Sequence, residues 1–274
     1  MFQNRAFLIM GAGSLGREIA RQLVKDNLVV CFDNSEQSLS KLQLEAPGVR
    51  LVSGDVTKYS DVEDAVLNVE FVIHTVAKKF VNYIEDNPQS AIDTNIDGTM
   101  NIIKACLKSN CVEKMVNIST DKVCYATSTY GLTKAITERL MIWATEKSQK
   151  NQVFTTIRLP NFPSDGSCFT IWQEQVRKKQ PITITDKRMT RWFIPTQKAA
   201  ELTLKVVKIA KGGEVFVPAV AKETSIMDLA REYGNNFKFI GKRPGERLRE
   251  VLMTSDEAKK AKKVCNNLLW RFIP

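Results

Sequence analysis

The stretch Ala6-Phe-Leu-Ile-Met-Gly-Ala-Gly-Ser-Leu-Gly16, near the start of the chain, decides the fold. The apolar run at 6–10 predicts a buried strand, and the glycines that follow it predict a tight turn. After the turn, Ile19, Ala20 and Leu23 recur at helical spacing. Glycines without a Cβ let a pyrophosphate approach the backbone, and the N-terminus of the following helix offers unpaired N–H groups to that anion. Strand, glycine turn and helix together therefore predict a dinucleotide-binding domain.

Acidic residues at the ends of the next two predicted strands extend this cofactor site. Asp33 follows the strand at 28–32, where a carboxylate can accept hydrogen bonds from both ribose hydroxyls and would repel a 2′-phosphate. This favours NAD over NADP, although Asn34 and nearby Arg17 leave room for the phosphorylated form. Asp55 follows the strand at 49–52 and is expected to reach the adenine amino group, with a helix N-cap as the alternative. The expected cofactor residues are Gly11, Gly13, Ser14, Leu15, Gly16, Asp33, Asn34, Asp55, Val56, Ala77, Tyr130 and Lys134.

Alternating strands and helices continue along the chain. Further strands are predicted at 71–74, 114–119, 153–158 and 214–217, with helices at 90–109 and 131–147. This order predicts an α/β fold with a doubly wound parallel sheet, covered by helices on both faces. The segment 161–192 and the residues beyond 217, with a helix at 225–233, fall outside the pattern. We expect residues 1–158 plus 194–218 to form the dinucleotide-binding domain, and 159–193 plus 219–274 a substrate lobe over the carboxyl ends of the strands.

Composition narrows the remaining classes. The cysteines are scattered and His74 is the only histidine, which argues against a zinc site or a disulfide framework, so no metal is expected. No apolar run is long enough for a membrane span, and no room for a secretory leader precedes the glycine turn, so a cytoplasmic protein is expected. The net charge is +10, but its one dense cluster, Lys259, Lys260, Lys262 and Lys263, is predicted to be a solvated face of a C-terminal helix. Nucleic acid and membrane are therefore not expected as partners.

A tyrosine and a lysine in Tyr130-Gly-Leu-Thr-Lys134 supply candidate redox chemistry. Four residues apart at the start of a helix, the phenol and the ammonium share a face. The ammonium and an oxidised nicotinamide would stabilise the phenolate, so that Tyr130 could remove a hydroxyl proton while hydride passes to the cofactor. Thr120 or Ser119, at the end of the preceding strand, could hydrogen-bond the reacting hydroxyl.

An acid and a base stand side by side at Asp121 and Lys122, which simple oxidoreduction would not require. Once the 4-hydroxyl of a sugar is oxidised to a ketone, the proton on carbon 5 becomes acidic and the 6-hydroxyl becomes a β-leaving group. An acid–base pair at this point would permit elimination of water. The alternative is an exposed ion pair at the end of a strand.

These residues resemble those of the inverting UDP-N-acetylglucosamine 4,6-dehydratases, which are extended short-chain dehydrogenase/reductases of bacterial surface-sugar synthesis. The likeness is carried by ordered blocks along nearly the whole chain. They are His74-Thr-Val-Ala-Lys-Lys79, Glu85-Asp-Asn-Pro88, Thr94-Asn-Ile-Asp-Gly98, Ile118-Ser-Thr-Asp-Lys122, Tyr130-Gly-Leu-Thr-Lys134, Pro181-Ile-Thr-Ile-Thr-Asp186, Met189-Thr-Arg-Trp192, Gly212-Gly-Glu-Val-Phe-Val217 and Gly241-Lys-Arg-Pro-Gly-Glu246.

The resemblance implies a cycle on UDP-N-acetylglucosamine. Tyr130 with Lys134 oxidises carbon 4, Lys122 or Asp121 removes the carbon 5 proton, and Asp121 helps the 6-hydroxyl leave. Hydride then returns to carbon 6, and carbon 5 is inverted. Retaining relatives carry Asp-Glu where this chain has Asp121-Lys122, which favours inversion. The residues implied to hold the UDP-sugar are Lys79, Asn161, Thr185, Arg191, Arg243 and Glu246, each of which could instead form a structural salt bridge or contact.

Two other functions remain open at this level. A nucleotide-sugar 4-epimerase or 4-ketoreductase of the same fold would need Tyr130 and Lys134 but could dispense with Lys122. A non-catalytic dinucleotide-binding sensor is the other alternative, and the intact tyrosine–lysine pair weighs against it. A homo-oligomer is expected as the assembly.

Overall fold

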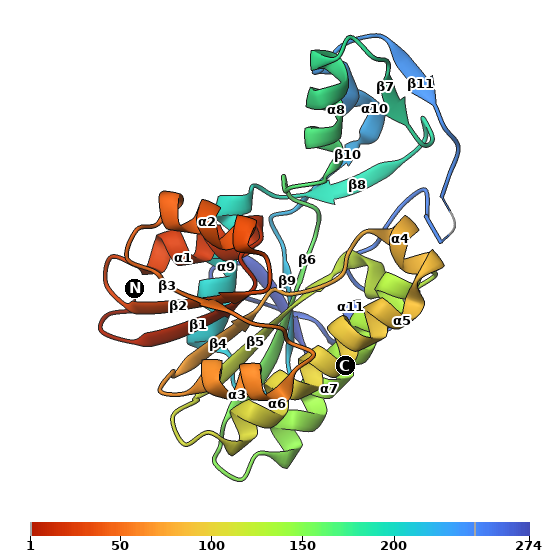
Figure 1. Cartoon of the computed structure of the whole chain (residues 1–274). Coiled ribbons are helices and arrows are strands. Elements are labelled where there is room, and N and C mark those ends of the chain that lie inside the picture. Colours follow the sequence, from red (N-terminus) through yellow and green to blue (C-terminus); the bar gives the residue numbers. More distant parts are fainter. Residues whose placement is uncertain (1, 244) are drawn as a thin grey trace.

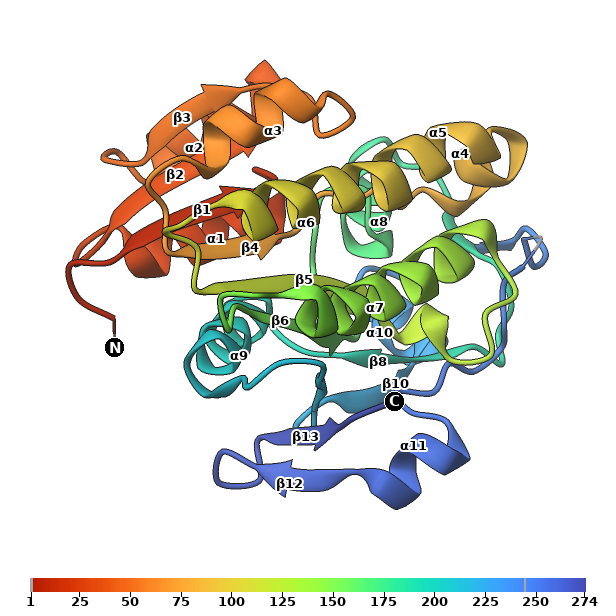
Figure 2. The ribbon, with the colours of Figure 1, turned by 90° about the horizontal axis from the view of Figure 1, so that it is seen from below.

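The computed structural model describes residues 2–243 and 245–274; Met1 and Pro244, which lies in the basic block ending at Glu246, are outside the described residues. A nine-stranded sheet forms the centre of the molecule (Figures 1 and 2). In spatial order its strands are β12 (Lys262–Val264), β13 (Leu269–Phe272), β9 (Val215–Pro218), β6 (Val153–Leu159), β5 (Lys114–Thr120), β4 (Phe71–His74), β1 (Ala6–Met10), β2 (Leu28–Asp33) and β3 (Arg50–Ser53).

The strands from β3 to β9 in this order pair in parallel, and β13 and β12 are added antiparallel. Helices cover both faces, as a parallel sheet requires. One face carries α1 (Ser14–Leu23), α2 (Glu36–Glu45) and α9 (Thr196–Ile209), and the other carries α3 (Tyr59–Val66), α6 (Gly98–Lys108) and α7 (Thr129–Lys147). The predicted doubly wound fold is confirmed.

Alternation along β1 shows how the central strand serves both layers. Phe7 and Ile9 belong to the core under α1 and α9, whereas Leu8 and Met10 belong to the core under α3 and α6. All four side chains are completely buried. A strand buried on both faces reads as a continuous apolar run, which is why 6–10 is uniformly hydrophobic.

A smaller unit stands above the carboxyl ends of the strands (Figure 1). It contains α8 (Cys168–Arg177), β7 (Ile182–Ile184), β8 (Thr190–Phe193), β10 (Lys222–Ser225), α10 (Ile226–Arg231) and β11 (Phe237–Phe239). Antiparallel β8–β10 and parallel β7–β11 pairs join its two segments, and Trp172 lies in its own apolar core. The two segments that left the sheet pattern thus pack together, while the exact division of the chain into two units stays a prediction.

The C-terminal residues depart from the predicted helix at 259–263. The helix α11 (Ser255–Lys260) ends early, and Lys262 and Lys263 lie on β12. The Lys263 ammonium rests 5.0 Å from the centre of the Trp270 ring on β13, and β13 pairs with β9. Residues 262–272 therefore extend the main sheet, although the sequence assigned them to the substrate lobe. The pairing is between segments about fifty residues apart, which local periodicity does not report.

The predicted helix at 90–109 contains a π-helical turn, Ile92–Asp97, between α5 (Pro88–Ala91) and α6. The turn aims the amide of Asn95 inward, where it is completely buried. Its Oδ1 accepts from the Lys78 backbone N–H at 2.7 Å, and its Nδ2 donates to the Lys78 carbonyl at 3.1 Å and to Thr133 Oγ1 at 3.0 Å. The turn thereby ties the segment after β4, which also includes α4 (Val81–Asp86), to the start of α7.

We predict that alanine destabilises the protein at one glycine of the first turn and has little effect at another. A Cβ at Gly16 would collide with the backbone carbonyl of Gly11, whereas a Cβ at Gly13 would have no atom within 4 Å. Gly16→Ala should lower the free energy of unfolding by about 2 kcal/mol or more, and Gly13→Ala should change it by less than about 0.5 kcal/mol. Urea denaturation of both variants checks this, and equal stabilities would contradict the packing role of Gly16.

Candidate active site

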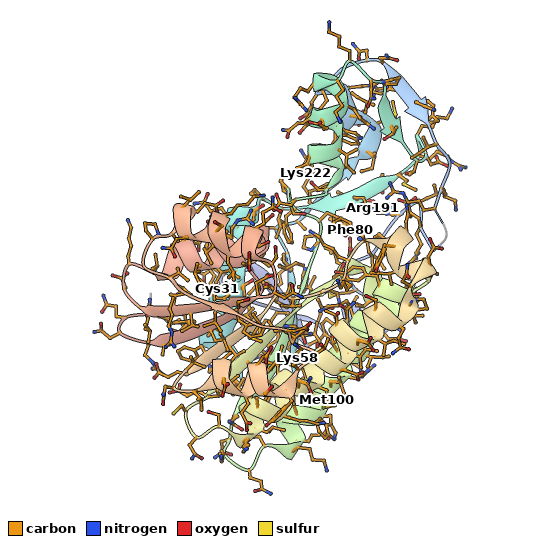
Figure 3. The ribbon with its side chains drawn as sticks, viewed as in Figure 1. Cys31, Lys58, Phe80, Met100, Arg191 and Lys222 are labelled. Carbon is orange, nitrogen blue, oxygen red and sulfur yellow. The ribbon has the colours of Figure 1, made fainter. Side chains whose placement is uncertain are left out.

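A cavity of about 870 Å³ lies between the sheet and the smaller unit. Arg191 on β8 and Phe80 after β4 mark the two sides of this junction (Figure 3). Every residue that the sequence selected lines this cavity except Asp121. Those residues are Gly11, Gly13, Ser14, Leu15, Gly16, Asp33, Asn34, Asp55, Val56, Lys79, Ala77, Thr120, Lys122, Tyr130, Lys134, Asn161, Thr185, Arg191, Arg243 and Glu246. The topology thus brings groups from the whole chain to one place.

The glycine turn has the shape and donors that a diphosphate needs. Gly11 has φ +113°, a backbone conformation open to glycine, and its N–H donates to the Phe32 carbonyl at 2.7 Å. Gly13 is extended, and a Cβ there would enter open space beside the cavity. No side chain caps α1, so the N–H groups of its first turn are available to an anion. The residues present therefore fit a dinucleotide.

Asp33 is held by the backbone around it. Its Oδ2 accepts from the Ala12 N–H and its Oδ1 from the Ser35 N–H, both at 2.7 Å. A carboxylate has further lone pairs, which can face ribose hydroxyls. Arg17 is not a free cation beside it, because its guanidinium contacts Glu45 at 3.1 Å and Asp165 at 3.2 Å. This arrangement supports the predicted preference for the unphosphorylated cofactor.

Asp55 is not the N-cap of α3, a position that Lys58 occupies. Its Oδ1 accepts from the N–H and the hydroxyl of Thr57, both at 2.9 Å. The carboxylate lines the cavity next to Val56. Its proposed contact with adenine stays a prediction.

Tyr130 and Lys134 lie on the first turns of α7, and burial shifts the pKa of both side chains. Burial lowers the pKa of Lys134 to about 8, against an opposing effect of Glu138. Its Nζ is 3.4 Å from Asn117 Oδ1, to which it donates. Burial raises the pKa of Tyr130, the Asp121 carboxylate adds to this rise, and a hydrogen bond with Thr120 opposes it. Desolvation is the largest of these effects, because burial disfavours the charged phenolate. Stabilisation of the phenolate by the Lys134 ammonium together with an oxidised nicotinamide stays a prediction.

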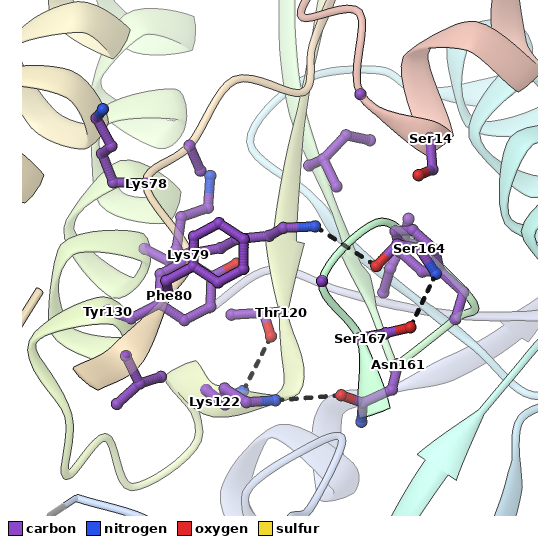
Figure 4. Close-up of a pocket in the computed structure, with 18 of the residues that line it drawn as sticks. Ser14, Lys78, Lys79, Phe80, Thr120, Lys122, Tyr130, Asn161, Ser164 and Ser167 are labelled. Atoms are coloured by element: carbon purple, nitrogen blue, oxygen red, sulfur yellow. Dashed lines mark hydrogen bonds between the residues drawn. The ribbon is translucent and has the colours of Figure 1, made fainter. Parts of the chain in front are cut away.

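Asp121 and Lys122 form a hydrogen-bond network at the ends of β5 and β6. Figure 4 shows the contacts of Lys122 with Thr120 and Asn161. Asp121 Oδ1 accepts from Lys122 Nζ at 2.9 Å and from Thr120 Oγ1 at 3.0 Å, and its Oδ2 accepts from Asn161 Nδ2 at 3.1 Å. Lys122 Nζ also lies 3.5 Å from Asn161 Oδ1. The carboxyl side chain is 1% exposed and the lysine side chain 23%. The pair is therefore largely enclosed, unlike an exposed surface ion pair, and only its lysine lines the cavity.

The loop at 164–167 contacts both sides of the cavity mouth. Lys79 Nζ donates to the Ser164 hydroxyl at 3.4 Å (Figure 4). It also donates to the Asp165 carbonyl at 3.2 Å. From the other side, the Asp165 N–H donates to Ser14 Oγ at 3.1 Å and its carboxylate pairs with Arg17. The loop thus connects the first turn of α1 with the segment after β4.

Other residues implied to hold the substrate contact one another. Arg191 Nη2 lies 3.6 Å from Glu246 Oε1, and the Arg243 N–H donates to Glu246 Oε2 at 3.1 Å. Thr185 Oγ1 lies 3.1 Å from the sulfur of Met189. These contacts preorganise the groups, and their role toward a substrate stays a prediction.

The sequence reasoning did not select several cavity residues. The aromatic residues among them are Phe32, Phe80, Phe162, Phe169, Trp172 and Phe193. The acid Glu250 also lines the cavity. Its place four residues after Glu246 in the last block was the one available signal. Among the described residues, no group of three or more potential metal ligands gathers, and no helix is long and apolar enough to cross a membrane.

The parallel sheet with its glycine turn and the Tyr130–Lys134 pair define an extended short-chain dehydrogenase/reductase fold, which solved neighbours share. A family model described as "Polysaccharide biosynthesis protein" matches residues 7–270. The chain belongs to this family.

Its relatives include both dehydratases and epimerases. The inverting UDP-N-acetylglucosamine 4,6-dehydratase of Campylobacter jejuni (serotype O:2) is 33% identical, over 94% of this chain and 80% of the relative. A UDP-glucose 4-epimerase of Rickettsia bellii is 31% identical, over 97% and 82%. Among solved structures, Pen from Bacillus thuringiensis has a TM-score of 0.92 at 33% identity, covering 100% of this chain and 89% of its own. These findings support an enzyme of the nucleotide-sugar dehydratase and epimerase group.

Lys134→Met should separate activity from stability. The lowered pKa of Lys134, about 8, means that the folded state disfavours the ammonium by about 3 kcal/mol. The variant should lose turnover, yet at pH 7 its free energy of unfolding should equal or exceed that of the wild type by up to about 2 kcal/mol. The wild type gains stability as pH rises from about 8 toward the unfolded pKa near 10.5, so the difference should shrink there. Urea unfolding at pH 7 and at a pH near the unfolded pKa of about 10.5 checks this. A variant that is less stable than the wild type at pH 7 would contradict it.

Proposed function

We propose that the protein is a UDP-N-acetylglucosamine 4,6-dehydratase that inverts carbon 5 and forms a UDP-4-keto-6-deoxy-hexosamine. The observation that carries this proposal is the enclosed Asp121–Lys122 pair, 2.9 Å apart, whose lysine lines the same cavity as Tyr130. A 4-epimerase or 4-ketoreductase has no use for a second base at this point. The similarity to the inverting dehydratase of Campylobacter jejuni supports the same conclusion.

Two sets of cavity residues act on neighbouring carbons of the sugar, one at carbon 4 and the other at carbon 5. Tyr130 receives the proton of the sugar 4-hydroxyl. Thr120, which shares a hydrogen bond with Tyr130, holds the phenol oxygen in place. Lys122, as the amine, removes the carbon 5 proton, while Asp121 and Asn161 fix the position of its nitrogen. Loss of the 6-hydroxyl as water follows from the acidity that the 4-ketone gives to carbon 5.

The glycine turn, Asp33 and Asp55 are proposed to hold a nicotinamide dinucleotide. When bound, it supplies an acceptor for the carbon 4 hydride and later a donor of hydride to carbon 6. Solved structures of this fold with bound NAD include a dTDP-glucose 4,6-dehydratase from Streptomyces venezuelae. Asp33 favours NAD over NADP because its charge would face the extra phosphate.

Arg191, Arg243, Glu246 and Lys79 are proposed to receive the UDP moiety. Guanidinium groups match diphosphate oxygens, and the carboxylate suits hydroxyl groups. The partner is therefore a UDP-sugar, and neither nucleic acid nor a membrane is proposed. We also propose a homo-oligomer in the cytoplasm.

A 4-epimerase is the second candidate, because epimerases are among the relatives. Epimerisation needs the Tyr130–Lys134 pair and leaves carbon 5 untouched. The two activities therefore differ in whether carbon 5 exchanges its proton with solvent. A non-catalytic sensor would leave the sugar unchanged.

Incubation with UDP-N-acetylglucosamine in deuterated water, followed by NMR, tests the proposal. We expect loss of the 6-hydroxyl and deuterium at carbon 5 of the product. Lys122→Ala should lower the rate at least about 100-fold and spare dinucleotide binding, because it removes the base alone. Lys104→Ala, at an exposed lysine of α6, is the matched control. An axial 4-hydroxyl without deuterium would identify an epimerase, and full turnover by Lys122→Ala would refute the assigned base.

Asp33→Asn tests the cofactor assignment. We expect the wild type to bind NAD at least about tenfold more tightly than NADP, because like charges oppose each other at the ribose. The amide keeps the size of the side chain and removes its charge, so the ratio of the two dissociation constants should fall. Titration by calorimetry measures both constants, with Asp26→Asn, an exposed position, as the control. An unchanged ratio would show that Asp33 does not select the cofactor.

A further inference from the structure

Arg158, near the end of β6, holds a buried cluster of charges that the chemistry above does not use. The residue is 1% exposed. Its Nε and Nη2 donate to the two carboxylate oxygens of Glu138 on α7, at 3.1 and 2.8 Å. Its Nη1 and Nη2 donate to the two oxygens of Glu257 on α11, at 2.9 and 3.0 Å. Both sides of the planar guanidinium therefore form bidentate pairs, which fix its orientation.

The groups of this cluster stay ionised. Burial lowers the pKa of Arg158, but Glu138 and Glu257 raise it by more. Burial likewise raises the pKa of Glu257, but the hydrogen bonds from Arg158 help to lower it by more. Two carboxylates thus meet one guanidinium, and desolvation offsets much of the attraction in such a cluster. Its main effect is therefore expected in the arrangement that it imposes on the elements around it.

The same guanidinium is connected to both ends of the segment that carries the Asp121–Lys122 pair. On one side, Glu138 Oε1 also accepts from the Ser119 hydroxyl at 2.5 Å. On the other side, Arg158 Nη1 donates to the Cys124 sulfur at 3.0 Å. These two contacts lie just before and just after the pair in the sequence. One side chain of β6 therefore holds both flanks of the turn that presents the proposed base.

The C-terminal part of the chain contacts the same turn. Arg247 Nη1 donates to the Cys124 carbonyl at 2.8 Å, and its guanidinium lies 5.6 Å from the centre of the Tyr125 ring. Tyr125 has φ +51°, a left-handed conformation that is unfavourable for a bulky residue. Such a conformation persists only where surrounding contacts hold it. Arg158 anchors this part of the chain as well, because its Nη1 donates to the Leu252 carbonyl at 2.9 Å.

We propose that Arg158 is a positioning residue for the elimination of water, an inference that rests on the proposed function. By holding both flanks of the turn, it keeps Asp121 and Lys122 in the orientation that acts on carbons 5 and 6. Oxidation of carbon 4 depends instead on Tyr130 and Lys134 of α7. A displacement of about 1 Å at a reacting group can lower a rate about 100-fold. A change at Arg158 should therefore slow elimination more than oxidation.

Arg158→Lys, assayed on UDP-N-acetylglucosamine, tests this role. Lysine keeps a positive charge beside Glu138 and Glu257, but it cannot form two bidentate pairs and reach Cys124 at once. We expect product formation at least about tenfold slower, with unchanged binding of UDP. Reduced cofactor should accumulate, because oxidation of carbon 4 precedes the slowed step; its near-ultraviolet absorbance reports this. Arg139→Lys, at an exposed arginine of α7, is the matched control and should keep the wild-type rate.

Two variants at Cys124 test the same link without removing a charge. Cys124→Ala loses the acceptor for Arg158 Nη1, whereas Cys124→Ser keeps an acceptor there. Elimination should be at least about threefold slower in Cys124→Ala than in Cys124→Ser. Both replacements make the side chain smaller, so a loss of packing alone would slow both alike. The double variant Arg158→Lys/Cys124→Ala should be less impaired than the product of the two single effects, because both changes break one contact.

Several results would overturn the assignment of Arg158. One is a loss of less than about tenfold in Arg158→Lys, and another is slow turnover without accumulation of reduced cofactor, which a general disturbance of the fold would produce. A third is equal turnover of Cys124→Ala and Cys124→Ser, a comparison that also decides the matter if Arg158→Lys does not fold. A wild type that forms no 4-keto-6-deoxy product would instead reject the proposed function itself.

Discussion

A buried negative charge at the end of β5 organises the centre of this molecule. The Asp121 side chain is 1% exposed, and an isolated carboxylate at such a depth is unstable. Its compensation comes from Thr120 and Lys122 beside it and from Asn161 at the end of the neighbouring strand. Satisfying the charge therefore requires β5, β6 and the loop after β6 to meet in one arrangement, and that arrangement also presents the Lys122 amine to the cavity.

The direction of the parallel strands explains why residues that line one cavity can be so far apart in sequence. Parallel strands all end at one edge of the sheet, so each strand end contributes to a common site. Residues after β1, β2, β3, β4, β5 and β6 consequently line one cavity. The second unit adds Arg191 and Glu246, which pair with each other across separate segments.

Local patterns in the sequence predicted the features that depend on periodic spacing and the residues that stand at the ends of strands. The glycine turn, Asp33 and the Tyr130–Lys134 spacing depend on neighbours along the chain, and their residues line the cavity. Patterns failed where the partner was distant: β12 and β13 join the sheet only through β9. The rise in the pKa of Tyr130 was also invisible, because helical spacing reports the nearness of Lys134 but not the desolvation that both groups undergo. Glu250 was missed because its burial beside the cavity arises from tertiary packing.

The loop at 164–167 has a kinetic consequence. Asp165 contacts Ser14 and Arg17 of α1, and Lys79, in the segment after β4, contacts the same loop from the other side of the cavity mouth. A dinucleotide lying along the glycine turn would be roofed by these contacts, and its escape would require several of them to break together. An enzyme that returns the hydride to its product within each cycle does not need to exchange its cofactor. Slow dissociation would therefore not limit turnover, and the dinucleotide would stay bound from one cycle to the next.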